Sequence, residues 1–304
     1  MSESTWKTRA EEDMGVRLTQ WQTLSGGDFA QSYAASVSAV DSRASNLPHF
    51  TIGQRIFIKT HANPPPEHFT TEARGLQWLS DTNTVQVPTV LGVSDEIPYL
   101  ALIWIEETRQ AGGAEHRHTE REFGRQLAAL HTVPLDRFGR RDSRPTGSLS
   151  VPNSPSFTWA DFYATQRLLP LARIASDRQA LSASTVGDIE RVAQRLSEWV
   201  DDEISASLLH GDLWAGNRLV DINQQSWVID PACHGGHREF DLAMMSLFGG
   251  YAPECFDAYQ EASALDDGWQ QRVSLHQLAP LIVHCIKFGA SYVQPTKEAL
   301  ARYV

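Results

Sequence analysis

Apolar residues in the first hundred positions recur at two spacings, which together predict a β-rich unit that contains a helix. Short apolar or alternating runs bounded by polar loops are typical of strands. Four such runs predict strands over residues 32–40, 55–60, 85–93 and 99–105. Between the second and the third run, apolar residues three and four positions apart predict a helix over 69–80. A weaker pattern of the same spacing predicts a first helix over 5–14.

Helical spacing dominates the chain beyond residue 106. It predicts helices over residues 117–131, 159–174, 186–202, 241–264 and 267–304. A loop rich in glycine, proline and serine covers 139–155, and short strands at 208–209 and 227–229 flank a polar loop. The sequence therefore predicts an α+β fold of two units, a small β-rich unit over 1–106 and a larger helical unit over 107–304.

The composition is that of a globular protein and indicates neither a nucleic-acid nor a membrane partner. The 304 residues are 41% hydrophobic and 21% charged, and the formal net charge is -11. The densest cationic stretch, 137–144, also contains Asp142 and lies in a loop, so we interpret it as a solvated loop rather than a nucleic-acid-binding patch. No apolar run approaches the roughly 18 residues of a membrane span. The acidic balance does not exclude ATP, because Mg²⁺ and a few local cations suffice for its phosphates.

The cysteines and the first residues of the chain indicate the cellular compartment in which the protein is expected. Cys233, Cys255 and Cys285 fit no zinc pattern, and an odd number of cysteines suits no disulfide framework. The first 15 residues lack the apolar core of a signal peptide. We therefore expect a cytoplasmic protein. The sequence carries no indication of its oligomeric state.

The residues that indicate chemistry gather in one segment, 208–232, which reads LLHGDLWAGNRLVDINQQSWVIDPA. Phosphoryl transfer needs a carboxylate beside the attacking hydroxyl and oxygen ligands for the Mg²⁺ on the ATP phosphates. Asp212 suits the first task, and Asn217 and Asp230 suit the second. The pattern HGDxxxxN followed by an aspartate resembles the catalytic loop and metal-binding aspartate of protein kinases. HGD is the form found in the related aminoglycoside and choline kinases. This resemblance implies a protein-kinase-like fold of two lobes.

The β-rich unit holds two side chains that such a fold would use on ATP. Lys59, near the end of the predicted strand 55–60, is the candidate to pair with the α- and β-phosphates. Glu72, on the following helix, is the candidate to hold Lys59 by an ion pair. Glu67 competes for this role, but it lies beside three prolines and before the helical pattern begins.

Two further segments are candidates for contacts with the nucleotide. Gly26 and Gly27 would form a phosphate-covering turn that offers backbone N–H groups, although the GxGxxG pattern of protein kinases is absent. The segment LIWIEE, 102–107, would be the hinge that offers backbone groups to adenine. Its candidate residues are Trp104, Ile105 and Glu106.

Longer stretches resemble the fructosamine kinase, or ketosamine 3-kinase, family. The most discriminating are HGDLWAGN and the REFDLAM run within IDPACHGGHREFDLAMMSLFGG; LSGGDFAQSYAASV, TNTVQVP, FYATQRLLPL and VHCIKFG add to the likeness, which covers about 24–292. The resemblance implies that ATP, with Mg²⁺, phosphorylates the sugar 3-hydroxyl of a ketosamine, the product of amine glycation. The unstable 3-phosphate would then release the sugar and restore the amine, which is deglycation or protein repair.

The same resemblance implies roles for particular residues. Asp212 would be the catalytic base. Trp214 and His284 would line the sugar pocket. His210 and Asp241 would support the catalytic loop.

Other functions stay open. A kinase for another hydroxylated amine, such as an aminoglycoside or a choline-like compound, would need the same ATP machinery. A pseudokinase scaffold is disfavoured by the joint presence of Lys59, Asp212, Asn217 and Asp230. A protein kinase acting on peptides is disfavoured because FDLAMM follows Asp230 almost at once, with no activation loop. The sequence does not indicate the ketose, or whether its amine belongs to a small molecule or a protein lysine.

Overall fold

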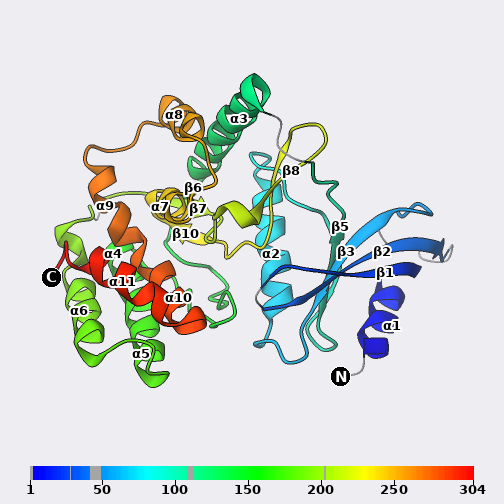
Figure 1. Cartoon of the computed structure of the whole chain (residues 1–304), viewed down its shortest axis with the longest axis horizontal. Helices are drawn as coiled ribbons and strands as arrows, with labels where there is room; N and C mark the ends of the chain where they lie inside the picture. The colour runs from blue at the N-terminus through cyan, green and yellow to red at the C-terminus, as the bar shows by residue number, and fades with distance from the viewer. Residues whose placement is uncertain (1–2, 28, 42–48, 109–111, 202) are drawn as a thin grey trace.

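A computed structural model describes residues 3–27, 29–41, 49–108, 112–201 and 203–304. Figure 1 shows a β-sheet at one end of an elongated molecule and a group of helices at the other. The sheet is antiparallel throughout, in the order β1-β2-β3-β5-β4. Its strands are β1 (Val16–Leu24), β2 (Gln31–Val40), β3 (Arg55–Thr60), β4 (Val90–Ser94) and β5 (Tyr99–Ile103).

Two helices accompany the sheet, and they bury different faces. Helix α1 (Glu3–Met14) packs Trp6, Ala10 and Met14 into a cluster with the apolar residues of β1, β2, β3 and β5. Helix α2 (His68–Asp81) buries Leu76 and its apolar neighbours in a second cluster, which also contains residues of segment 208–232 and of helix α3 (Gly113–His131). Helix α2 therefore joins the sheet to the rest of the chain through a shared core (Figure 1).

The remaining elements form the helical end and two small sheets. The further helices are α4 (Trp159–Tyr163), α5 (Leu169–Asp177), α6 (Ala183–Gln194), α7 (Glu239–Leu247), α8 (Pro253–Ala262), α9 (Trp269–His276), α10 (Leu278–Phe288) and α11 (Val293–Leu300). One sheet has the order β10-β7-β6, with β10 (His234–Gly236), β7 (Ala206–Leu209) and β6 (Pro134–Leu135). The other is the hairpin of β8 (Arg218–Val220) and β9 (Ser226–Val228). These short strands position the polar segment between β7 and β10.

Most predicted elements are confirmed, with corrections to both strands and helices. Strands β1, β6, β8 and β10 were not predicted. The predicted strand 85–93 is wrong in its first half, because Pro88 has no N–H for a ladder bond and regular pairing starts only at β4. The predicted helix 186–202 ends with α6. The predicted helices 241–264 and 267–304 are each interrupted: Gly249 and Gly250 separate α7 from α8, and Gly289 separates α10 from α11, all three with positive φ. The division at residue 106 stays a prediction.

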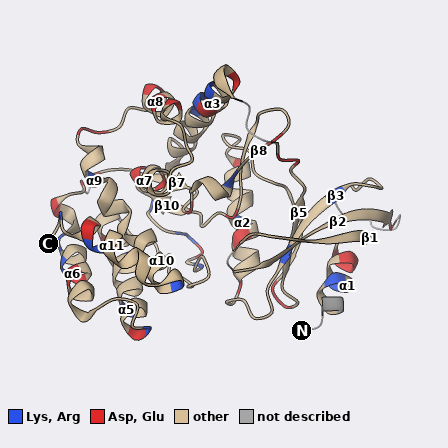
Figure 2. Cartoon of the chain, viewed as in Figure 1, with Lys and Arg blue, Asp and Glu red and all other residues tan. Residues whose placement is uncertain are grey.

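Charged residues are spread over the molecule, and neither sign dominates one end (Figure 2). Figure 2 shows Lys and Arg scattered among Asp and Glu over both ends of the molecule. Within the part of the chain that the structure describes, no helix combines the length and the apolar character that crossing a bilayer requires.

Candidate active site

The segment after β7 is fixed by a buried carboxylate. Asp241 in α7 accepts hydrogen bonds from the backbone N–H groups of His210 and Gly211, at 2.8 and 2.9 Å. Its Oδ2 also lies 3.3 Å from Nε2 of the buried His131 in α3. Burial, the largest single influence, opposes ionisation, but the hydrogen bond and charge of His131 act with His210 and the Gly211 N–H, and together they lower the pKa of Asp241. An ionised acceptor held by α7 therefore sets the backbone of the HGD segment.

Gly211 is required by this backbone. Its φ is +82°, and a Cβ added there would overlap the carbonyl oxygen of Ala232. His210 lies beside it, and its Nε2 is 2.9 Å from the carbonyl oxygen of Ile229, while its Nδ1 accepts from the N–H of Asp212. Burial lowers the pKa of His210, so the ring is neutral and donates from Nε2. The loop is thus tied to the strand that leads to Asp230.

Asp212 and Asn217 face one another across the loop. The Asn217 side-chain nitrogen donates to the Asp212 carbonyl oxygen at 2.8 Å and to Asp212 Oδ2 at 3.1 Å. Both bonds use the amide nitrogen, so the amide oxygen is the atom of Asn217 that could bind a cation. The Asn217 backbone carbonyl accepts from Ile229, which places Asn217 next to the residue that precedes Asp230.

Asp230 is joined to the large sheet by Lys59. The Lys59 ammonium lies 2.8 Å from Asp230 Oδ1 and 2.6 Å from Glu72 Oε1. Glu67 instead pairs with Arg144 at 2.9 Å. Asp230 has a φ of +54°, an uncommon conformation for a residue other than glycine, and its side chain stays 47% exposed. An open carboxylate held in an unusual backbone conformation is typical of a functional position.

Burial and charge act against one another in this group. Burial alone would lower the pKa of Lys59, but the Asp230 and Glu72 carboxylates outweigh it and raise that pKa. At Asp230 the protein surroundings alone would raise the pKa, but the charge and hydrogen bond of Lys59, together with the nearby His210 and His68, outweigh this and lower it. At Glu72 burial prevails and raises the pKa to about 7, with a contribution from the Asp230 charge.

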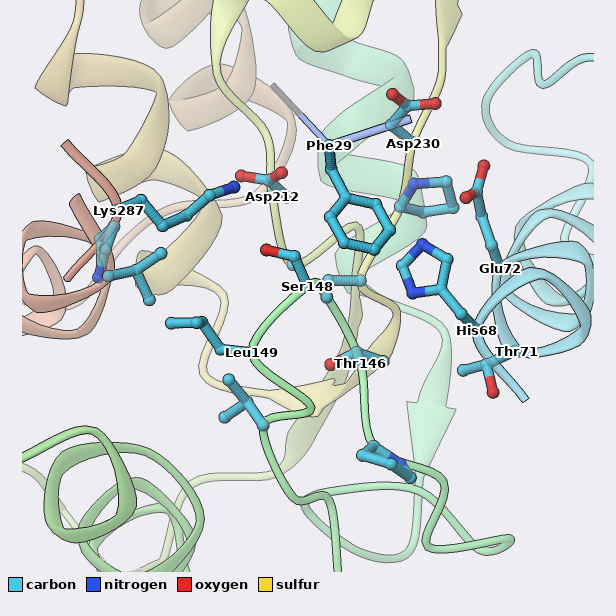
Figure 3. A pocket seen from close by; sticks show the side chains of 18 of the residues that line it. Phe29, His68, Thr71, Glu72, Thr146, Ser148, Leu149, Asp212, Asp230 and Lys287 are labelled. Carbon is cyan, nitrogen blue, oxygen red and sulfur yellow. The ribbon is translucent and has the colours of Figure 1, made fainter. Parts of the chain in front are cut away.

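One cavity of about 260 Å³ receives most of these side chains. Figure 3 shows Lys287 on one side of Asp212, and Asp230 and Glu72 on the other side. Of the residues predicted from the sequence, the cavity wall includes Gly27, Lys59, Glu72, Asp212, Asp230 and His284.

The predicted hinge residues and Gly26 are not among the described residues that line the cavity. Trp104 donates from its indole nitrogen to Glu106 at 2.9 Å, and the Arg55 guanidinium covers its ring at 3.9 Å. These three side chains form a surface cluster beyond β5. The residues that line the cavity in the described part of the chain do not include Trp104, Ile105, Glu106 or Gly26. Their contact with adenine or its phosphates stays a prediction.

Trp214 and His284 both pack against Phe248. The His284 ring packs 4.8 Å from both Phe248 and Tyr292, measured between ring centroids. Trp214 is 41% exposed and packs edge-on to Phe248. A Cβ at position 216 would overlap the Trp214 ring, so Gly216 allows the ring to lie over the loop.

Several residues of the cavity were missed by sequence reasoning. Phe29 stacks on His61 at 4.2 Å and lies 4.8 Å from His68, and both Phe29 and His68 line the cavity. Segment 145–149 forms another wall, and Lys287 points into the cavity from α10 (Figure 3). Phe29 and Lys287 lie within LSGGDFAQSYAASV and VHCIKFG, the stretches that carry the family resemblance. That resemblance was the available signal for them.

A second group of metal-ligating side chains lies outside the cavity, but hydrogen bonds already engage it. His237, Glu239 and His276 are buried and close together. Both Glu239 oxygens accept from Arg272, at 2.9 and 2.6 Å. His276 Nε2 accepts from Trp159, and His237 Nδ1 accepts from the Glu239 N–H. We interpret this group as a buried polar network that holds α7 to α9.

Comparison with known proteins agrees with this geometry. The model of the fructosamine kinase family matches residues 4–304. The chain belongs to the fructosamine kinase family. It is 33% identical over 279 residues to "Probable ketoamine kinase" of Enterococcus faecium, covering 91% of this chain and 93% of that one. It is also similar to a crystal structure named "putative fructosamine-3-kinase" of Thermobifida fusca, with 34% identity, a TM-score of 0.83 and 99% of each chain covered.

The family and its structural neighbours define the fold and the class of enzyme. A streptomycin–ATP ternary complex of a more distant protein has a TM-score of 0.63 at 15% identity, covering 99% of this chain and 97% of that one, which is a likeness of fold alone. This fructosamine kinase family member has the predicted protein-kinase-like α+β fold and is an ATP-dependent small-molecule kinase.

Proposed function

We propose that this kinase transfers the γ-phosphoryl group of ATP to the 3-hydroxyl of ketosamines and so starts their deglycation. The observation that supports it best is the meeting of Lys59, Asp212 and Asp230 at one cavity. The names of similar proteins, ketoamine kinase and fructosamine-3-kinase, support the acceptor class. In this proposal, the unit 1–106 binds ATP and the unit 107–304 binds the acceptor.

Asp212 is the proposed base. Its carboxylate lines the cavity and is held by Asn217, so it can orient the acceptor hydroxyl and take its proton. The hydroxyl oxygen then bonds to the γ-phosphorus as the bond to the ADP oxygen breaks. His210 and Asp241 act through the loop backbone and are positioning residues.

Asn217 and Asp230 are the proposed Mg²⁺ ligands. The donor set consists of an amide oxygen and a carboxylate, which suits this hard cation. When bound, Mg²⁺ neutralises charge on the β- and γ-phosphates. Lys59, oriented by Glu72, is proposed to pair with the α- and β-phosphates, and Gly26 and Gly27 to cover them.

The acceptor side is proposed to hold the sugar against Trp214 and His284. Phosphorylation at the 3-hydroxyl would create a leaving group next to the ketose carbonyl, and loss of inorganic phosphate would release the sugar from the amine. After phosphate has left, water hydrolyses the remaining bond between the sugar and the nitrogen, so the overall reaction consumes ATP and one water and yields ADP, phosphate, a dicarbonyl sugar and the free amine. We propose this outcome from the family resemblance and the names of the relatives.

The test is ADP release with Mg²⁺ over a panel of a fructosamine, a ribulosamine, an aminoglycoside and choline. We expect turnover on the ketosamines alone, and phosphorus NMR should place the new phosphate on the 3-hydroxyl. Asp212→Ala should reduce kcat by about 10²–10⁴-fold while ATP binding survives. Asp257→Asn, which removes an exposed carboxylate of α8, is the control.

Other results would redirect the assignment. Turnover on the aminoglycoside or choline alone would replace ketosamines with another hydroxylated amine. No turnover on any acceptor, with ATP still bound, would favour the scaffold function. Full activity of Asp212→Ala would remove Asp212 as the base.

A further inference from the structure

A short hairpin, residues 146–151, belongs to the loop between β6 and α4 and reaches the cavity. Thr146 and Val151 pair through both of their backbone groups, at 3.0 and 2.9 Å. The N–H of Ser150 donates to the Gly147 carbonyl at 3.1 Å, which closes a tight β-turn at the tip. Gly147 and Ser150 both have positive φ, an uncommon conformation for a serine. Such conformations gather at ligand-binding positions, where the surrounding structure holds them.

The tip of this hairpin faces the proposed base. Its two central residues, Ser148 and Leu149, line the same cavity as Asp212. Figure 3 shows the Ser148 side chain reaching toward Asp212, with Asp230 and Glu72 farther away on the other side of the cavity. The γ-phosphoryl group must lie between the base and the proposed metal ligands. The hairpin tip is therefore placed to contact the acceptor.

Buried polar groups fix the base of the hairpin. Asn153 is fully buried, and its side-chain nitrogen donates to the Arg144 carbonyl at 2.8 Å and to the Thr146 hydroxyl at 3.1 Å. Its side-chain oxygen accepts from the buried Arg167, which also donates to the Pro152 carbonyl, both at 2.6 Å. Hydrogen bonds of buried groups are costly to break. They therefore hold the tip in one position relative to the cavity.

The tip offers one polar and one apolar group to a ligand. Leu149 packs partly against the large apolar cluster of the helical end, so the core fixes its position. The Ser148 hydroxyl can both donate and accept a hydrogen bond, and a sugar hydroxyl matches both capacities. A few placed polar groups among apolar ones are typical of a small-molecule site. The pairing suits a sugar, in which C–H groups alternate with hydroxyls.

We propose that the tip of hairpin 146–151 binds the sugar half of the acceptor, with the Ser148 hydroxyl hydrogen-bonded to the 4-hydroxyl of the ketose. Ser148 is then a specificity-determining residue, and Asn153 is the positioning residue that holds its hairpin. This inference rests on the proposed ketosamine kinase function and adds a contact that recognises the sugar rather than the amine.

The chemistry of the ketose explains why the 4-hydroxyl is the fitting group. Transfer requires the 3-hydroxyl at Asp212, so a side chain that faces Asp212 reaches the substituents of the two neighbouring carbons. Carbon 2 is the ketose carbonyl, which only accepts, and it leads to the amine. Carbon 4 carries a hydroxyl and leads to the free end of the sugar. The hairpin wall is closed at its buried base by Asn153 and Arg167, so it suits the end of the ligand that does not continue.

The test compares two acceptors that differ only in this group, fructosyl-glycine and its 4-deoxy analogue. With purified enzyme and saturating MgATP, we expect wild-type kcat/KM to favour the 4-hydroxyl by about 3- to 10-fold, the effect of one neutral hydrogen bond. Ser148→Ala should bring the ratio near one by lowering kcat/KM for fructosyl-glycine alone, with the KM for ATP unchanged. Ser148→Thr keeps a hydroxyl and should restore most of the preference. Ser154→Ala, which changes an exposed serine of the same loop, is the matched control.

Each outcome separates this contact from the function it rests on. Equal wild-type kcat/KM for the two acceptors, or a preference that persists in Ser148→Ala, would overturn the contact and leave the ketosamine kinase intact. An equal loss for both acceptors in Ser148→Ala would mean a general disturbance of the site, and a raised KM for ATP would place the tip on the nucleotide side. Both results would likewise overturn the contact. If wild type phosphorylates neither acceptor, the proposed function fails and the contact falls with it.

Discussion

Lys59 of β3 and Asp230, which follows β9, lie 2.8 Å apart although 171 positions separate them in the chain. Glu72 of α2 completes the group from the other side at 2.6 Å. Three elements from different parts of the sequence therefore meet at one ammonium group. This contact links the large sheet to segment 208–232, and it sets the charge on the side of the cavity where we propose that ATP binds.

Replacing Lys59 tests that link. Lys59→Met removes the cation and leaves the Asp230 carboxylate and the buried Glu72 without their counter-charge. We expect affinity for MgATP to fall by about 10- to 100-fold, the effect of one or two charge-assisted hydrogen bonds. Thermal stability should fall as well, because breaking a buried ion pair is destabilising. Calorimetric titration with a non-hydrolysable ATP analogue measures the first effect. Lys297→Met is the control, and unchanged nucleotide affinity in Lys59→Met would place the phosphates elsewhere.

Gly211 tests the backbone of the HGD loop. Gly211→Ala adds a Cβ at a φ of +82°, where it overlaps the Ala232 carbonyl. The loop must move, and the hydrogen bonds to Asp241 weaken, so we expect a loss of about 1–3 kcal/mol in unfolding free energy and at least tenfold in kcat. Urea unfolding measures the change in unfolding free energy, and the rate of ADP release measures kcat.

A second glycine gives the opposite expectation. Gly187 lies inside α6 with open space around its Cβ direction. Gly187→Ala should therefore stabilise the protein by about 0.5–1 kcal/mol and leave kcat unchanged. Comparable losses in both variants would show that the effect at position 211 is not specific to the loop.

Much of the site could be predicted because its chemistry is local in the sequence. Asp212 and Asn217 are close along the chain, and the strand spacing indicated that Asp230 lies near them. Other parts depend on contacts that no local pattern encodes. The support of Asp241 by His131 joins α7 to α3, and Lys287 reaches the cavity from the C-terminal helices.

Strand β1 shows a different limit of sequence reasoning. Val16 and Leu18 are buried, but most of the later side chains of this edge strand are exposed, and the pairing with β2 shifts register twice. An edge strand with few buried positions has no apolar alternation to detect. The main-chain hydrogen bonds to β2, which specify it, leave no mark on the side-chain pattern.

Buried histidines predict sensitivity to acid. Burial, aided by the charge of Arg272, lowers the pKa of His276 to about 3. Below pH 6.5 the unfolded chain binds a proton that the folded chain does not, so the unfolding free energy falls as pH decreases. For this one residue the loss between pH 7 and pH 5 is about 2 kcal/mol.

A variant isolates that contribution. His276→Gln keeps an acceptor for Trp159 and cannot titrate in this range, so its unfolding free energy should fall less between pH 7 and pH 5. Urea midpoints at both pH values measure the difference. His118→Gln removes an exposed histidine of α3 and should follow wild type. If His276→Gln also follows wild type, His276 does not contribute to the acid sensitivity.

Gly216 offers a test of Trp214 that leaves the indole in place. An alanine at position 216 would overlap the Trp214 ring and force it off the loop. If Trp214 lines the sugar pocket, Gly216→Ala should raise the KM for a ketosamine by about tenfold, with little change in the KM for ATP. Trp214→Ala should have a similar effect, and the double variant should be no worse than the single ones, because both act on one contact. Gly187→Ala is again the control. Position 216 also precedes Asn217, so a fall in kcat with a changed Mg²⁺ requirement would show instead that the alanine disturbs the proposed metal ligand.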